Sequence, residues 1–140
     1  AASRSFAPGR ETSAGPPPLN LVVAKGTRLE VHLVDDNGLT LLIDVPIFGT
    51  VSVLRDFRPA GESLDRLWLV TERHRFCVLG FDASSGKIVT HAKGDVQDPV
   101  GQSVEYGGLG LVDPLCRCLA LHLYEGLLKV LPMDPRGHLK

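Results

Sequence analysis

Short apolar strands alternate with polar turns along most of the chain, and one strand–turn–strand phrase occurs three times. The second strand of each copy carries a valine, and these valines lie 47 and 52 residues apart: Val31, Val78 and Val130. Each copy is expected to be a β-hairpin, because two apolar strands flank a short polar turn. A self-similar unit of roughly 40 to 50 residues built from strands is typical of the blades of a β-propeller.

Period-two patterning predicts ten strands and almost no helix. The turn Asp36-Asn37-Gly38, for example, supplies the positive φ angles that tight hairpins require. The strands are expected at Leu19–Ala24, Arg28–Val34, Leu39–Val45, Thr50–Phe57, Arg66–Thr71, Arg75–Asp82, Lys87–Ala92, Leu109–Val112, Cys118–Leu123 and Leu127–Leu131. The fold class is therefore all-β, a β-propeller fragment of roughly two to three four-stranded antiparallel blades. Since a closed propeller takes at least ~4 blades, the chain is expected to be an arc of a ring.

The chain is expected to divide into a leader (residues 1–18), the opening blades (19–134) and the start of the next connection (135–140). The leader is made mostly of Ala, Ser, Gly, Pro and Arg without a period, and Phe6 is its only large apolar residue. It therefore lacks the apolar surface that would offset the entropy of ordering, and is predicted to be disordered. The same composition also fits the remnant of a transit peptide.

One segment is a candidate for contact with partners, the long polar loop Gly94–Gly108, which gives the second repeat its extra length. Insertions in repeat proteins gather in loops on one face, which is often the binding face. A plain connecting loop is the alternative interpretation. No individual partner-binding residue follows from the sequence.

The composition is that of an ordinary globular protein, with 140 residues, 44% of them apolar and 22% charged. The balance of 15 basic to 16 acidic residues gives a net charge of −1, which argues against direct binding of DNA or RNA. No apolar run approaches the ~18 residues that span a bilayer, so no membrane contact is expected. Three cysteines are too few for a secreted disulfide framework, which favours a reducing compartment.

Three short strings look like ligand-binding loops but fail their motifs. Gly80–Lys87 lacks the glycine and the Ser or Thr of a phosphate-binding loop, because Phe81 and Ile88 occupy those positions. Gly108-Leu109-Gly110 lacks the third glycine of a dinucleotide fingerprint, and Asp35-Asp36-Asn37-Gly38 lacks the later glutamate of a calcium loop. All three are predicted to be turns.

The residues that could carry catalysis or bind a metal are scattered. Cys116 and Cys118 have no second pair of ligands to complete a zinc site, and Cys77 is expected to be a small buried hydrophobe. Five histidines are spread over the elements: His32, His74, His91, His122 and His138. The carboxylates of Asp95 and Asp98 lie in a loop, where solvation is the simpler explanation. The chain is therefore predicted to be non-enzymatic, with no catalytic, cofactor-binding or metal-binding residue and no small-molecule substrate.

Several rare strings resemble those of one known family, in the same order along the chain. Leu19–Glu30 resembles the first block of the family of the large subunit of the damaged-DNA-binding complex. Later blocks, starting with the linker between the first two blades, resemble Phe57–Ser63, Gly94–Asp98, Asp113-Pro114 and Leu123–Val130. The resemblance runs from Leu19 to about Asp134.

The resemblance implies three β-propellers that serve as the adaptor of cullin-4-type ubiquitin ligases. In that family the first and third propellers clasp interchangeable substrate receptors, the middle one holds the cullin, and one receptor recognises damaged DNA. This chain would then form the opening blades of the first propeller. It would work in the nucleus, and also in the cytoplasm, and would meet damaged DNA in nucleotide-excision repair only through a receptor.

Relatives in pre-mRNA cleavage, polyadenylation and splicing complexes share this architecture, so a scaffold for RNA-processing partners is the alternative. The strings in this chain are closer to the repair adaptor. Family members also place a strand-like segment before the first block, which residues 1–18 do not reproduce in sequence. The resemblance gives no receptor-contacting residue that maps onto a numbered position here.

Overall fold

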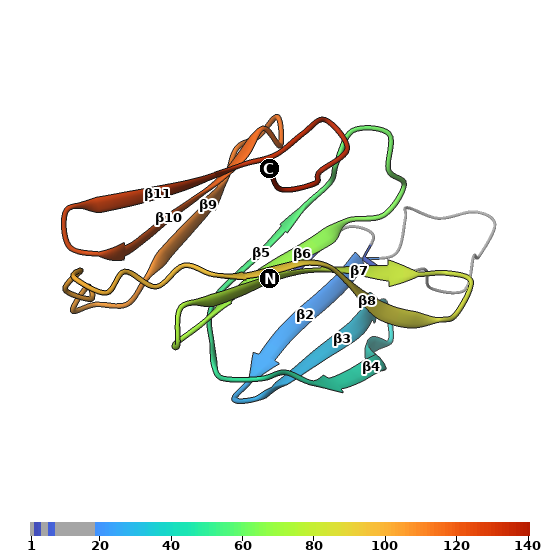
Figure 1. Cartoon of the computed structure of the whole chain (residues 1–140). Helices are drawn as coiled ribbons and strands as arrows, with labels where there is room; N and C mark the ends of the chain where they lie inside the picture. The colour runs from blue at the N-terminus through green and yellow to red at the C-terminus, as the bar shows by residue number, and fades with distance from the viewer. Residues whose placement is uncertain (1, 4–5, 8–18) are drawn as a thin grey trace.

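The computed structural model describes residues 2–3, 6–7 and 19–140 of the chain, and within them it contains eleven strands and no helix (Figure 1). No element of this described part is therefore a helix that could cross a bilayer. The strands are β1 (Ala2–Ser3), β2 (Leu19–Lys25), β3 (Arg28–Asp35), β4 (Gly38–Pro46), β5 (Val51–Phe57), β6 (Arg66–Thr71), β7 (Arg75–Asp82), β8 (Lys87–Asp95), β9 (Leu109–Val112), β10 (Cys118–Tyr124) and β11 (Leu127–Pro132).

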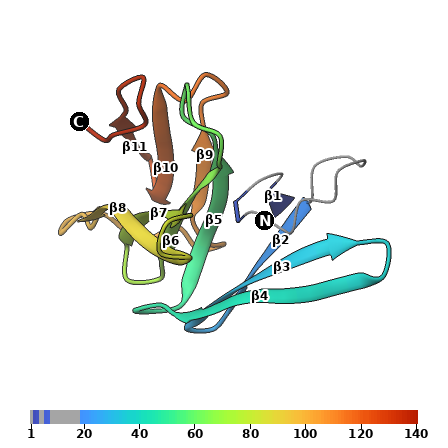
Figure 2. The ribbon, with the colours of Figure 1, turned by 90° about the vertical axis from the view of Figure 1, so that its right-hand side faces the viewer.

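The strands form three antiparallel sheets in chain order. Sheet A has the order β1-β2-β3-β4, sheet B has β5-β6-β7-β8, and sheet C has β9-β10-β11. Figure 2 shows the sheets fanned out, with β5 and β9 adjacent at the inner side. The prediction of an all-β propeller fragment with two to three antiparallel blades is confirmed.

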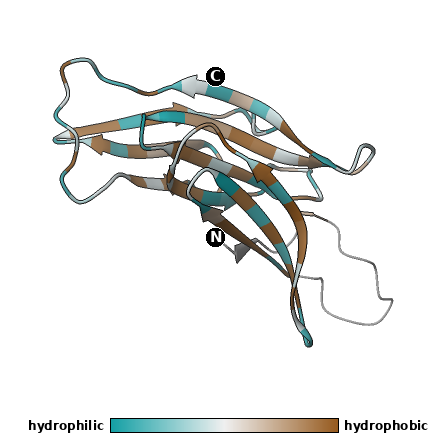
Figure 3. Ribbon diagram, turned by 90° about the horizontal axis from the view of Figure 1, so that it is seen from below, coloured by the Kyte–Doolittle hydropathy of each residue, from teal (hydrophilic) through white to brown (hydrophobic). Residues whose placement is uncertain are grey.

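All ten predicted strands are present. β6, β7 and β9 have the predicted bounds, and the other ends differ by one residue, except that β8 continues three residues further to Asp95. The alternation of apolar and polar side chains that predicted them is visible along the strands in Figure 3. Glycines with positive φ, such as Gly26 at 54° and Gly86 at 67°, lie in the hairpin turns, where residues with a Cβ would be strained.

Sheet B is apolar on both faces because it lies between the other two sheets. In β6 the side chains of Leu67 and Leu69 pack into a cluster with sheet A, and those of Trp68 and Val70 pack into a cluster with sheet C. All four are essentially inaccessible to solvent. Burial of each such side chain is worth about 1.5–3 kcal/mol, so these two clusters hold the sheets together face to face.

The prediction that residues 1–18 are disordered is wrong for the four leader residues that the structure describes. Ala2 and Ser3 form β1, which pairs antiparallel with Leu21 and Asn20 of β2, and Phe6 is completely buried in the core between sheets A and B. One aromatic residue is enough to order this segment, because β1 pairs with the free edge of β2 and the core accommodates the Phe6 ring. The rest of the leader lies outside the described residues.

With this short strand, sheet A has four strands, as sheet B has. β1 is the edge strand of sheet A next to β2, as β5 is of sheet B next to β6.

The residues after β11 fold back along it instead of leading away. The N–H of Asp134 donates to the His138 carbonyl at 2.9 Å, and Met133 pairs with Leu139 as an antiparallel bridge. Residues 135–140 thus form a turn at the end of β11, and that they start the next connection stays a prediction. Sheets A and B have a hairpin turn at the same place, between their third and fourth strands.

Because the strands within each sheet are antiparallel and sequential, every second connection emerges on the same side. One side, which we call the hairpin face, carries the turns 26–27, 72–74 and 125–126 and the links 47–50 and 96–108. Backbone hydrogen bonds join these segments, for example from the Ile47 N–H to the Thr27 carbonyl at 2.7 Å and from the Val96 N–H to the His74 carbonyl at 2.9 Å. The opposite face carries the remaining loops.

The outward face of sheet C and a part of that of sheet A carry exposed apolar side chains. On sheet C the side chains that point away from sheet B include Leu109, Leu111, Leu128 and Val130, all at least half exposed. On sheet A, Leu39 and Leu41 of β4 are exposed in the same way. Such rows of apolar side chains on a sheet face are typical of a surface that another sheet covers.

Candidate functional site

The residues singled out as possible metal ligands do not converge. Cys77 lies half-buried in β7, where burial raises its pKa to about 11, so the thiol stays protonated at neutral pH. The Cys116 thiol donates to the Arg58 carbonyl at 3.2 Å, and burial raises its pKa as well. In the part of the chain that the structure describes, no three His, Cys, Asp or Glu side chains are grouped as a metal site would require.

Of the strings that resemble ligand-binding loops, two contain turns as predicted, at residues 36–37 and 83–86, whereas Leu109 and Gly110 of the third string are the first residues of β9. In Gly80–Lys87 the hydroxyls of Ser84 and Ser85 donate to the carboxylate of Asp82, which lowers its pKa to about 2. In the turn at residues 35–38 the Asn37 N–H donates to the Asp35 carboxylate at 2.8 Å. These carboxylates are thus occupied by their own turns.

Of the loop predicted to be a candidate contact, residues 94–108, the first two residues belong to β8, and residues 96–108 cross the hairpin face between β8 and β9 (Figure 1). Val96 anchors its start, because this side chain is buried in the core between sheets B and C. The Gln97 side-chain amide then donates to the Arg73 carbonyl at 3.0 Å, which ties the loop to the turn between β6 and β7. The two loop carboxylates, Asp95 and Asp98, accept backbone N–H groups of the loop itself.

Tyr124, at the end of β10, is the central anchor of this loop. Its hydroxyl accepts the Asp98 N–H at 2.9 Å and lies 2.5 Å from Nδ1 of His74, whose ring packs edge-on against the Tyr124 ring. Since the hydroxyl accepts from Asp98, its own proton is available to be donated to Nδ1. His74 has a positive φ of 55°, which turns the β6–β7 hairpin so that its ring reaches Tyr124. One phenol therefore joins three segments of the hairpin face.

The second half of the loop is held by backbone contacts. The Val104 N–H donates to the Leu123 carbonyl at 3.1 Å, and the Glu125 N–H donates to the Gln102 carbonyl at 2.8 Å. Ser103 also pairs with Tyr124 as an antiparallel bridge. A 13-residue loop that is fixed at both halves is a preformed surface, so little conformational entropy would be lost when a partner binds.

The fixed loop leaves a recess and two protruding side chains. The recess has a volume of about 370 Å³ and is lined mainly by polar groups, among them Glu72, Arg73 and Asp98. Val100 and Tyr106 are 92% and 96% exposed on the loop around it. Exposed aromatic and apolar residues beside a polar recess are typical of a protein-binding surface.

Replacement of Tyr124 by phenylalanine is expected to loosen this loop and to lower the free energy of unfolding by about 1–3 kcal/mol, because the Asp98 N–H and His74 lose their partner in a part-buried site. Amide hydrogen exchange should become faster at Asp98 and its neighbours. Tyr106→Phe is the matched control, since that hydroxyl has no hydrogen bond among the described residues and should have no effect. Unchanged exchange at Asp98 in Tyr124→Phe would contradict the anchoring role.

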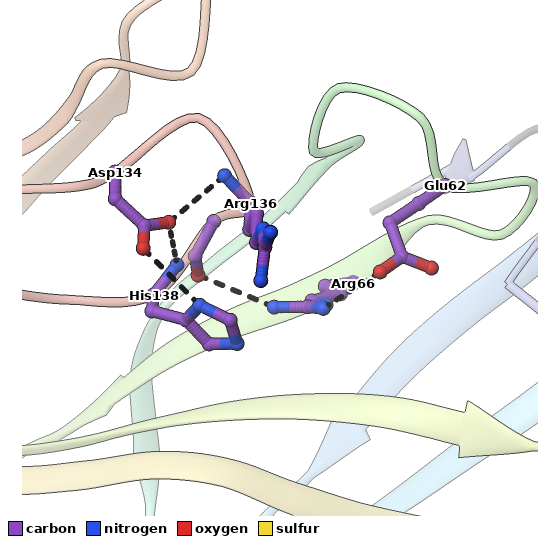
Figure 4. A network of polar contacts seen from close by, with 6 residues as sticks. Glu62, Arg66, Asp134, Arg136 and His138 are labelled. Carbon is purple, nitrogen blue, oxygen red and sulfur yellow. Dashed lines mark hydrogen bonds and ion pairs between the residues drawn. The ribbon is translucent and has the colours of Figure 1, made fainter.

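The opposite face carries a second polar network, which joins sheet B to the turn after β11 (Figure 4). The buried Arg66 guanidinium donates to the Gly137 carbonyl at 3.2 Å and to the Glu62 carboxylate at 3.1 Å. Asp134 accepts the N–H groups of Arg136 and His138 in the same turn. This network satisfies its own donors and acceptors and fixes the turn, so its role is structural.

The sequence predicted the loop but missed the residues that fix it. Tyr124 and His74 are 50 residues apart, and neither belongs to a motif, so no local pattern indicates their contact. The alternation along β10 is the one available signal. Leu119, Leu121 and Leu123 are buried on one side, and Tyr124 departs from that period by being buried as well.

Comparison with known proteins gives a consistent result over most of the chain. The model of the family described as RSE1/DDB1/CPSF1 first beta-propeller matches residues 13–140. The chain is 48% identical over 126 residues to DNA damage-binding protein 1 of Solanum lycopersicum, 50% identical over 125 residues to DNA damage-binding protein 1a of Arabidopsis thaliana, and 49% identical over 126 residues to DNA damage-binding protein 1 of Oryza sativa subsp. japonica. These alignments cover 89–90% of the chain but only 12% of each relative.

Proposed function

Because the chain belongs to the RSE1/DDB1/CPSF1 first β-propeller family, we propose that it supplies opening blades of a non-catalytic scaffold in a cullin-4-type ubiquitin ligase. In this proposal the full-length protein docks interchangeable substrate receptors, acts in the nucleus and meets damaged DNA only through a receptor. The observation that carries it is the 48–50% identity to plant DNA damage-binding proteins along 89–90% of the chain.

The exposed sheet faces support a place inside a ring. Leu109, Leu111, Leu128 and Val130 form an outward apolar surface on sheet C, and Leu39 and Leu41 add one on sheet A. We propose that neighbouring blades of the same propeller cover both surfaces, with residues 19–134 as its opening blades. Burial there would provide the same hydrophobic stabilisation that already holds sheet B between A and C.

The hairpin face supports docking as the physical mechanism. Its loop of residues 94–108 is fixed by Tyr124 and by the backbone of β10, while Val100 and Tyr106 project from it. In the proposed mechanism these two side chains contact a substrate receptor. Since the surface is preformed, binding energy is not spent on ordering the loop.

Affinity purification of the full-length protein from cells tests the assignment to a complex. Recovery of a cullin together with varied receptors is expected. Recovery of pre-mRNA cleavage, polyadenylation or splicing factors in their place would support the RNA-processing alternative and overturn the proposal. The double variant Val100→Ser/Tyr106→Ser should lose receptors about tenfold while it keeps the cullin, because exposed aromatic anchors dominate interface energies.

The control for the loop is Leu115→Ser, which removes a similarly exposed apolar side chain from a turn on the opposite face. Receptor recovery should be unchanged in this variant. Loss of receptors with Leu115→Ser and not with the double variant would place docking on the other face, without affecting the assignment to a ubiquitin ligase.

A further inference from the structure

An apolar groove opens on the outer rim of the fan, between sheets A and B. It encloses about 500 Å³. The end of β4 and the link after it form one wall with residues 45–48, and Leu79 and Ile88 of β7 and β8 belong to the other. Phe48 is completely exposed at its mouth. Both walls belong to this chain, so the groove does not depend on which blades cover the end sheets.

Two cations lie at one end of this groove. Arg75, the first residue of β7, and Lys93, near the end of β8, both line it and both lie close to the hairpin face. Neither forms an ion pair with any residue that the structure describes. Asp95 lies opposite Arg75 in the sheet register, but its carboxylate accepts the Gln97 N–H at 2.8 Å. The groove is thus apolar along its length and positively charged at one end.

Unpaired strand edges border the groove. β4 and β8 are the last strands of their sheets, so within the described residues no further strand pairs with their outer edges. Both strands run toward the hairpin face, since each follows a hairpin turn on the opposite face. An edge strand offers backbone N–H and C=O groups that an extended peptide can satisfy.

We propose that this groove is a docking site for an extended peptide segment that carries acidic residues at its N-terminal end, followed by alternating apolar side chains. The carboxylates would pair with Arg75 and Lys93, and the apolar side chains would cover Phe48 and the groove floor. Antiparallel pairing with β8 is the commoner arrangement of neighbouring strands, and it places the peptide's first residues at the charged end. The strand edge favours a peptide over a fatty acid, which has a carboxylate and an apolar chain but no backbone to pair.

The test uses the full-length protein as bait for a displayed library of random 12-residue peptides, with the charge-reversed variant Arg75→Glu/Lys93→Glu as counter-bait. Enrichment of peptides with Asp or Glu before an alternating apolar stretch is expected. A synthetic copy of the enriched peptide should bind the wild-type protein at least tenfold more tightly than the charge-reversed variant, because reversal replaces two attractions by two repulsions. The same peptide with lysines in place of its acidic residues should prefer the variant.

The control variant Arg136→Glu/Lys140→Glu makes the same change in net charge at two exposed cations outside the groove, and should bind the acidic peptide as the wild type does. Phe48→Ser should weaken binding several-fold without loss of stability, since that ring is exposed. Backbone N-methylation of alternate peptide residues should abolish binding. The proposal is overturned if no acidic peptide is enriched, if the control variant loses binding equally, or if decanoate competes while the N-methylated peptide still binds.

Discussion

Replacement of Asn20 by alanine is expected to lower the free energy of unfolding of the propeller by about 2–4 kcal/mol and to release the leader from sheet A. The Asn20 side-chain oxygen accepts the backbone N–H groups of Phe6 and Ala7, each at 3.0 Å, and all three residues are buried. Without that oxygen two buried donors have no acceptor, at about 1–3 kcal/mol each. If the leader detached from sheet A, the N–H groups of Phe6 and Ala7 would both reach water. This limits the loss of stability but exposes the Phe6 ring.

Urea denaturation measures the loss of stability, and amide hydrogen exchange at Phe6 and Ala7 identifies where it occurs. Asn37→Ala is the comparison, because Asn37 is an exposed asparagine of a hairpin turn and its replacement should cost about 0.5 kcal/mol or less. If Phe6 and Ala7 stayed as protected in Asn20→Ala as in the wild type, the capping role of Asn20 would be refuted.

Replacement of Gly110 by alanine is expected to cost about 2–3 kcal/mol by forcing sheets B and C apart. A Cβ at Gly110 would lie 2.4 Å from Cγ1 of Val53, and 3.2 and 3.3 Å from two ring atoms of Trp68. The Gly110 carbonyl also accepts the Arg55 Nε–H at 2.9 Å across the same junction. The added methyl group would therefore clash with side chains at the junction of sheets B and C.

A double-mutant cycle with Val53→Ala tests this steric explanation. Val53→Ala alone should cost about 2 kcal/mol, because it removes buried methyl groups. It also removes the atom that the new Cβ would strike. The loss of unfolding free energy in the double variant should therefore be smaller than the sum of the two single losses, by about 1 kcal/mol or more. Strictly additive losses would show that the Val53 contact is not the reason why glycine is needed.

The sequence was sufficient for the strands because their signals are local. The turn at Gly86 fixes where β7 ends and where β8 starts, and both bounds were predicted correctly. The missed features depend on partners far along the chain. β1 forms because it pairs with β2 and because the Asn20 side chain accepts the Phe6 N–H that follows it. A two-residue strand has no periodicity of its own that the sequence could reveal.

The candidate site shows the same limit. The loop 94–108 was predicted from its length and composition, but its fixation depends on Tyr124 and on the left-handed conformation of His74. These residues come together only after sheets B and C have packed. The rim groove has the same origin, since Arg75 and Lys93 come from different strands and their wall partner, residues 45–48, belongs to another sheet.

The packing of each sheet against its successor also has a consequence during translation. Val31 and Leu79 share one core cluster although 48 residues separate them, so the ribosome must add almost a whole repeat before the first sheet acquires its cover. At about 5–20 residues per second this takes roughly 2 to 10 s. Throughout that interval the apolar inner face of sheet A is exposed on the nascent chain. The interval is long enough for ribosome-associated chaperones to bind this face and for neighbouring chains on a polysome to aggregate with it.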